Sequence, residues 1–177
     1  MGIFLYLETD PETPVCPHEL TTADSKLFQN FQVLMDRPTW RAPDGTLTTL
    51  DRALRVDVSA LGANSVADGT ETSLEEYYEW FPDTETGRAE ALQAYQRQRE
   101  RDAAAWQPPQ ELLRCLREVI AAIDAHPDVT SQIGEGLAHA DRRYFAEGWW
   151  RADLAAMLRN IEWAAEHGAK RVRLAAA

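Results

Sequence analysis

The sequence has few of the features that would assign the protein to a functional class at once. Only two of its 177 residues are cysteines, Cys16 and Cys115, too few for the disulfide framework of a small secreted domain. No stretch approaches 18 consecutive apolar residues and the N-terminus lacks a basic segment, so we expect neither a membrane span nor a secretion signal. We therefore expect a cytoplasmic protein, and two lysines against sixteen arginines favour a bacterial source with a GC-rich genome.

Recognisable catalytic and cofactor motifs are also missing. The chain contains no GxSxG, HExxH, GxGxxG or GxxxxGK[ST] pattern, so nucleophile elbows, zinc-protease helices and phosphate loops have no local support. Cys16 and His18 are both competent zinc ligands, but a structural zinc site needs four ligands and no second pair follows. We expect no cofactor and no bound metal, and we favour a protein without enzymatic activity.

Basic charge is scarce, and the resulting acidity is unevenly distributed. The net charge is −11, and residues 1–80 hold 14 acidic against 5 basic side chains, whereas residues 81–177 hold 15 against 13. Nucleic acids and anionic membranes are bound by clusters of Lys and Arg, so we expect neither as a partner. A basic protein partner fits this charge, although acidity that only maintains solubility explains it too.

The apolar patterning predicts one globular α+β domain over residues 1–177. Residues 2–7 and 171–174 have the character of strands and are expected in one small sheet. Residues 39–61 are interpreted as a small hairpin followed by a strand, although Leu50, Leu54, Val58 and Leu61 also keep helical spacing. We expect loops at 8–21 and 62–72, and about five helices: a twelve-residue helix from Thr22, then 73–81, 85–106, 109–126 and 149–167, with Gly168 just past the last one and a possible further helix at 137–145.

The segment SLEEYYEWFPD, residues 73–83, concentrates aromatic and acidic side chains. Ser73 and Glu76 form a capping-box pattern, and on a helix the aromatic residues separate from the acidic ones. This pattern is typical of an amphipathic helix with an aromatic core face, in which Trp80 lies at the margin. The alternative interpretation is a binding surface for a basic partner, whose contact residues would be Glu75, Glu76, Glu79 and Trp80.

One flank of the last predicted helix combines aromatic and polar side chains. Its members are Trp149, Asp153, Asn160, Trp163 and His167. They could line a pocket between this helix and the sheet, with Asp153 or His167 as acid or base. A wide buried flank with hydrogen-bonded indoles explains the same pattern.

Two functional hypotheses follow from these observations. The first is a small acidic interaction or inhibitor-type protein that binds a basic partner, by the same charge complementarity as the immunity proteins that neutralise nucleases; the analogy concerns charge and size only. The second is a hydrolase or small-molecule-binding protein with its pocket at the Trp-rich last helix. A homodimer formed through the sparsely apolar 85–106 helix is compatible with either.

Overall fold

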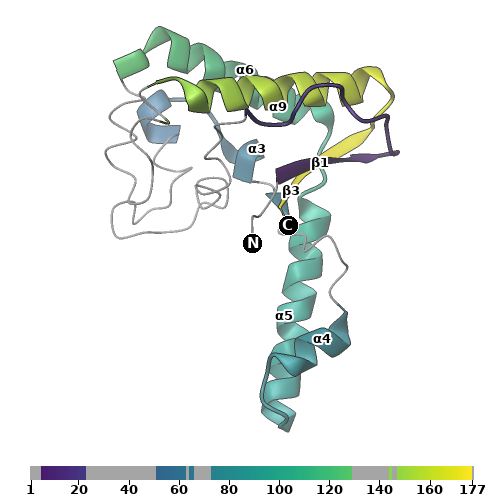
Figure 1. The fold of residues 1–177 in the computed structure, drawn as a ribbon. Coiled ribbons are helices and arrows are strands. Elements are labelled where there is room, and N and C mark those ends of the chain that lie inside the picture. The colour runs from purple at the N-terminus through teal and green to yellow at the C-terminus, as the bar shows by residue number, and fades with distance from the viewer. Residues whose placement is uncertain are drawn as a thin grey trace.

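The computed structural model describes residues 5–22, 51–62, 64–65, 73–128, 144 and 147–176, and the predicted α+β architecture is confirmed. Figure 1 shows a body, in which helices α6 (Pro109–Ala125) and α9 (Trp149–Glu166) lie side by side next to a small sheet, and an arm formed by α4 (Leu74–Glu79) and α5 (Glu85–Ala104). No helix in these ranges is both long and apolar enough to cross a membrane.

The two body helices form where the sequence predicts them. Pro109 occupies the first turn of α6, where its missing N–H is not needed. Gly148 precedes α9 with φ of 79° and Gly168 follows it with φ of 96°, conformations that glycine adopts without strain. Gly168 therefore ends the helix as predicted.

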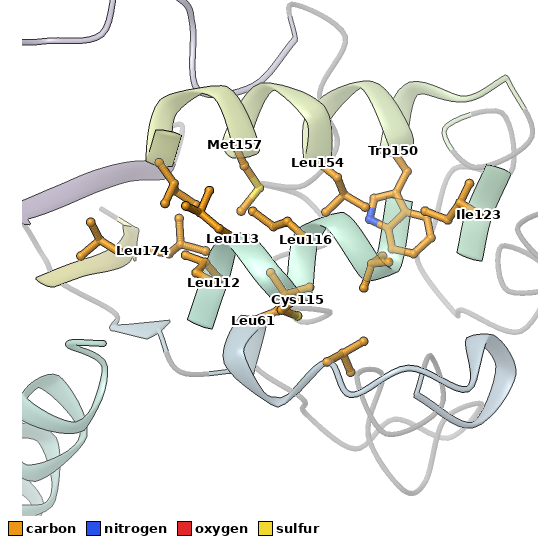
Figure 2. Close-up of a cluster of buried hydrophobic side chains, with 14 of the residues drawn as sticks. Leu61, Leu112, Leu113, Cys115, Leu116, Ile123, Trp150, Leu154, Met157 and Leu174 are labelled. Atoms are coloured by element: carbon orange, nitrogen blue, oxygen red, sulfur yellow. The ribbon is translucent and has the colours of Figure 1, made fainter. Parts of the chain in front are cut away.

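The hydrophobic core lies between α6 and α9 and continues onto the sheet (Figure 2). Trp150, Leu154 and Met157 of α9 face Leu116 and Ile123 of α6, and all five are at most 5% exposed. Burial of each such side chain contributes roughly 1.5–3 kcal/mol. The core therefore rests on the two apolar stripes that the sequence displays most clearly.

The N-terminal and C-terminal strands pair as predicted. Strand β1 (Leu5–Asp10) runs antiparallel to β3 (Arg171–Ala176), with Leu5 opposite Ala176 and Asp10 opposite Arg171. A two-residue strand, β2 (Asn64–Ser65), lies parallel to β3 on its other side. The predicted loop at 8–21 is wrong for residues 8–10, which continue β1 because Glu8 and Asp10 form ion pairs with Arg173 and Arg171 across the strands.

The strand expected at the end of residues 39–61 is also wrong. Residues 51–54 are helical and a short helix, α3, spans Ser59–Gly62. Leu54, Val58 and Leu61 are buried, so the helical spacing identified the inward-facing residues, while Arg55 with φ of 56° separates the two turns. The loop predicted at 62–72 is wrong at Gly62, which ends α3, and at Asn64–Ser65, which form β2. The predicted helix beyond Thr22, residues 39–50, residues 63 and 66–72, and the possible helix at 137–145 apart from Tyr144 lie outside the described residues.

The arm is a helical hairpin held by one close backbone contact. The predicted capping box of α4 is present, and Thr84 caps α5 by accepting a hydrogen bond from the backbone N–H of Gly87. A Cβ added at Gly87 would stand 2.1 Å from the carbonyl oxygen of Pro82, so only glycine allows this approach. In α5 only Gly87 and Ala91 are buried, so this long helix packs lightly, as expected.

The aromatic face of α4 is not the core face that the sequence favours. None of its residues is buried, because among the described helices and strands its main contact is with α5, which is itself largely exposed (Figure 1). Tyr77 is half-buried and the side chains of Tyr78 and Trp80 are 38% and 61% exposed.

Candidate functional site

The far end of the arm presents aromatic rings to solvent. The Tyr77 ring lies 5.0 Å from that of Trp80 and 5.5 Å from that of Tyr95, the second pair edge-to-face. Tyr77 thus links α4 to α5 and supports one side of Trp80, an arrangement that stabilises aromatic pairs. The indole is 61% exposed, which is unusual for a side chain of this size and polarity.

The segment that contains this indole is acidic. Residues 73–90 contain six Asp and Glu and one arginine, Arg88, which pairs with Asp83 at 2.7 Å. Glu75 and Glu79 are exposed and make no hydrogen bond or ion pair within the part of the chain that the structure describes. We call the four exposed residues Glu75, Tyr78, Glu79 and Trp80 the arm tip.

Glu76, the remaining predicted contact residue, has a structural task. Its Oε2 accepts a hydrogen bond from the backbone N–H of Ser73 at 2.7 Å, and its own N–H donates to Ser73 Oγ at 3.2 Å. The carboxylate is therefore fixed at the start of α4, where it also suits the helix dipole.

The polar flank of α9 holds the segment that follows β1. Asp153 is fully buried; its Oδ1 accepts hydrogen bonds from the backbone N–H and the hydroxyl of Thr22, both at 2.7 Å, and its Oδ2 accepts one from the Tyr144 hydroxyl at 2.8 Å. Burial and the adjacent carboxylate raise the pKa of Tyr144. Asp153 is thus a buried anion with three donors, the arrangement that makes such burial tolerable.

The next turns of the flank repeat this tethering. Asn160 Nδ2 donates to the carbonyl oxygens of Ala156 at 2.9 Å and Glu19 at 3.2 Å. Trp163 Nε1 donates to the carbonyl oxygen of Pro14 at 3.0 Å. The His167 ring stacks on the Trp163 ring, with 3.9 Å between the ring centroids. His167 Nδ1 also lies 2.8 Å from the backbone carbonyl oxygen of Trp163.

The five flank residues do not converge on one chemical site. Trp149 packs half-buried against the core, and Asp153 and His167 stand 14 residues apart on one helix, roughly 21 Å along its axis at 1.5 Å per residue. No acid–base pair is formed between them.

A cavity of about 670 Å³ lies between α9 and the sheet. Asn160 and Trp163 line it, whereas Trp149, Asp153 and His167 do not. Its other walls are β1, the segment 12–20 and Trp106. Sequence reasoning missed Glu8, Glu12 and Val15 here, and the 92% exposure of Val15 has no counterpart in any sequence pattern.

Cys16 and His18 also line this cavity. Within the described residues no group of three or more His, Cys, Asp or Glu side chains is arranged to hold a metal ion.

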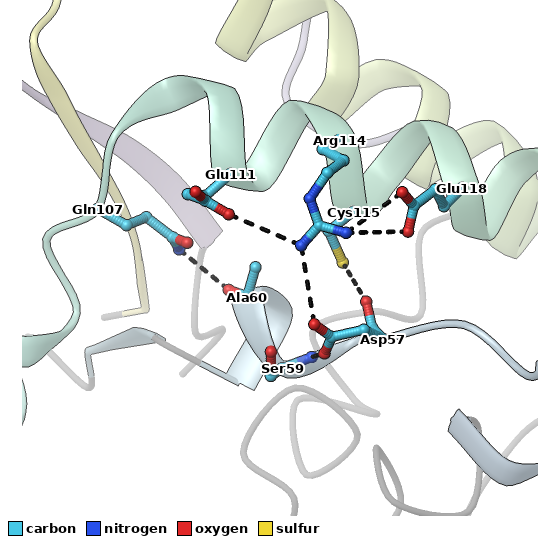
Figure 3. A network of polar contacts seen from close by, with 8 residues as sticks. All are labelled: Asp57, Ser59, Ala60, Gln107, Glu111, Arg114, Cys115 and Glu118. Atoms are coloured by element: carbon cyan, nitrogen blue, oxygen red, sulfur yellow. Dashed lines mark hydrogen bonds and ion pairs between the residues drawn. The ribbon is translucent and has the colours of Figure 1, made fainter.

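A second polar cluster, shown in Figure 3, fastens the 57–62 segment to α6. Arg114 bonds Glu118 at 3.1 Å and lies 3.7 Å from carboxylate oxygens of Asp57 and Glu111. Cys115 Sγ donates to the carbonyl oxygen of Asp57 at 3.4 Å, and burial raises the pKa of this thiol to about 11. A buried thiol of that pKa is not a nucleophile at neutral pH, so this cluster is structural.

No family model matches the chain, and neither the curated proteins nor the solved structures give a match. The functional argument therefore rests on the geometry of the chain itself.

Proposed function

We propose that this is a non-enzymatic, inhibitor-type interaction protein whose arm tip binds a basic surface of another protein. The observation that carries the proposal is the exposed Trp80, whose ring contacts that of Tyr77, at the end of a helix that also carries the exposed side chains of Glu75 and Glu79. Tryptophan anchors carry a large share of binding free energy in many interfaces, and surrounding charge accelerates encounter with an oppositely charged partner.

The position of the tip on the arm favours the same role. Helix α5 extends away from the body (Figure 1) and, at 20 residues, is roughly 30 Å long. The close contact of Gly87 with Pro82 fixes α4 on this helix, so little conformational freedom is lost on binding. A partner can therefore contact the tip without contacting the body.

We do not propose a hydrolase, because the two candidate acid–base residues stand far apart on α9 and neither lines the cavity. A homodimer through the arm would compete with a basic partner for this surface, and sedimentation experiments distinguish the two.

The test is quantitative recovery of partners from lysate of the source cells at low and high salt. The variant Glu75→Lys/Glu79→Lys reverses the charge of the tip but leaves the capping residue Glu76 intact, and Trp80→Ala removes the anchor. The matched control, Glu147→Lys/Glu166→Lys, makes the same charge change at exposed sites of the body. Circular dichroism checks that each variant is folded.

We expect wild type and control to retain one basic protein at low salt and release it at high salt, because exposed charge pairs are screened. Both tip variants should retain at least about tenfold less, a loss of about 1.4 kcal/mol. Equal recovery by wild type and tip variants would overturn the proposal, as would an arm-dependent homodimer in sedimentation experiments with no basic partner.

A further inference from the structure

Strand β1 is an edge strand of the sheet. Within the described residues the strand order is β1–β3–β2, so one edge of β1 directs its alternate N–H and C=O groups away from β3. Edge strands are usually protected by charged side chains, Pro or bulges. LYLETD contains no Lys or Pro, and its two charged side chains, Glu8 and Asp10, pair with arginines of β3. Its first three residues also lack charge.

The cavity follows this edge. It is lined by the five consecutive residues Leu5–Thr9, whose side chains point alternately to opposite faces of the sheet. Because all five residues line it without a gap, the cavity runs along the length of this part of β1. Five residues of strand extend over roughly 17 Å, so the cavity is a groove of the length of a short extended peptide.

Part of the groove lining is apolar. Pro14, Leu20, Trp106 and Trp163 line it, and Val15, also in the lining, is 92% exposed.

The charge of the groove favours a cation. Glu8 and Glu12 line it, and no Lys or Arg does so among the residues that the structure describes. Glu8 is paired with Arg173, whereas Glu12 is exposed and makes no ion pair within the same residues. The Glu12 carboxylate is therefore the one that can pair with a cationic group bound in the groove.

We propose that this groove binds an extended segment of a partner polypeptide, which pairs with the edge of β1 as an added strand. The segment carries apolar side chains for the wall around Val15 and Trp106, and a Lys or Arg that reaches Glu12. Main-chain hydrogen bonds supply affinity in such strand addition, and the side-chain pockets supply specificity. This site is separate from the arm tip and does not depend on the function proposed for it.

The test begins with a random dodecapeptide library displayed on phage and selected on the full-length protein. Enriched peptides are synthesised with a fluorophore, and their dissociation constants are measured by fluorescence anisotropy. The variants are Glu12→Lys and Val15→Asp, both at exposed positions, and the control is Glu90→Lys, which makes the same charge change at an exposed position in the second turn of α5. Amide hydrogen exchange of β1 is measured with and without peptide.

We expect Glu12→Lys and Val15→Asp to weaken binding about tenfold or more and Glu90→Lys to leave it unchanged. Exchange at β1 amides should slow on binding. Alternate N–H groups of the peptide point to opposite edges of an added strand, and only one edge faces β1. N-methylation of one alternate set of residues should therefore abolish binding, and N-methylation of the other set should leave it unchanged.

Three results would overturn this assignment. In the first, the selected peptides bind the Glu12→Lys and Val15→Asp variants as tightly as wild type. In the second, N-methylation of either alternate set of residues reduces affinity equally. In the third, bound peptide slows amide exchange elsewhere but not in β1. A library that yields no binder while a small apolar dye occupies the groove would also overturn it, in favour of a small-molecule pocket.

Discussion

At the scale of single residues, the buried carboxylate of Asp153 joins three separate parts of the chain. Thr22 and Tyr144 both donate to it. We expect Asp153→Ala to lower the free energy of unfolding by about 3 kcal/mol or more, because three donors lose this acceptor in a buried site. Asp153→Asn keeps the oxygen that serves Thr22 and should cost about 1 kcal/mol.

Urea denaturation measures both values. The control is Asp124→Ala, since Asp124 also forms a charged pair, with Arg151, but at an exposed site; exposed pairs contribute roughly 0–1 kcal/mol. Equal effects of Asp153→Ala and Asp124→Ala would contradict the role assigned to Asp153.

Because the Cys115 thiol is buried, we expect the protein to lose stability at alkaline pH. Burial raises its pKa from the ordinary 9.0 to about 11, so the folded state favours the protonated thiol. The protonated thiol's contribution to the free energy of unfolding is fully present below pH 9. It is lost as the pH rises from about 9 to 11, and the total loss is roughly 2–3 kcal/mol. The raised pKa of Tyr144 acts in the same direction at higher pH.

Thiolate absorbance in a Cys16→Ser background follows Cys115 alone. We expect no titration near pH 9 in the folded protein and titration near pH 9 in urea. A folded-state midpoint at the ordinary value would show that the thiol is accessible to water and would remove this source of alkaline sensitivity.

At the scale of elements, Gly87 determines whether the arm holds its shape. In an unobstructed helix Gly→Ala stabilises by up to about 1 kcal/mol. Here the added methyl group meets the backbone carbonyl of Pro82, so we expect Gly87→Ala to destabilise the hairpin by about 1–3 kcal/mol. Trp80 fluorescence and hydrogen exchange of α4 report the change, and a stabilised arm would contradict the contact.

The elements that the sequence predicts correctly are those with a dense apolar stripe and a definite stop. Helix α6 has both, with Pro109 near its start and Pro127 beyond its end. The sequence could not show what the aromatic face of α4 packs against. An amphipathic helix has the same pattern of aromatic and acidic residues whether it packs on a hydrophobic core or on one exposed helix. The end of β1 depends on arginines more than 160 positions away.

The candidate sites divide in the same way. The residues of the arm tip are neighbours in sequence, so their grouping could be predicted, although the capping role of Glu76 competes with the contact role given to it. The groove combines β1, the segment 12–20 and one turn of α9. Periodicity is a local property and does not show which distant segments meet.

At the scale of the whole molecule, strand β3 joins the two ends of the described chain, because it pairs with β1. This strand lies between β1 and β2 and buries Val172 and Leu174, so the first and last segments of the described chain stabilise one another. The arm contributes little to this closed body, because most of its side chains face solvent.

This division predicts two levels of local stability in one molecule. Few buried apolar contacts imply opening at low free energy, and α4 has no buried residue while α5 has two. Native-state hydrogen exchange should therefore show α4 and the outer half of α5 opening well below the global unfolding free energy, with α6 and α9 exchanging only on global unfolding. A basic partner bound at the tip should protect the arm amides, and a peptide bound in the groove should protect β1. Uniform exchange across the arm and the body would show that the arm is part of the cooperative core.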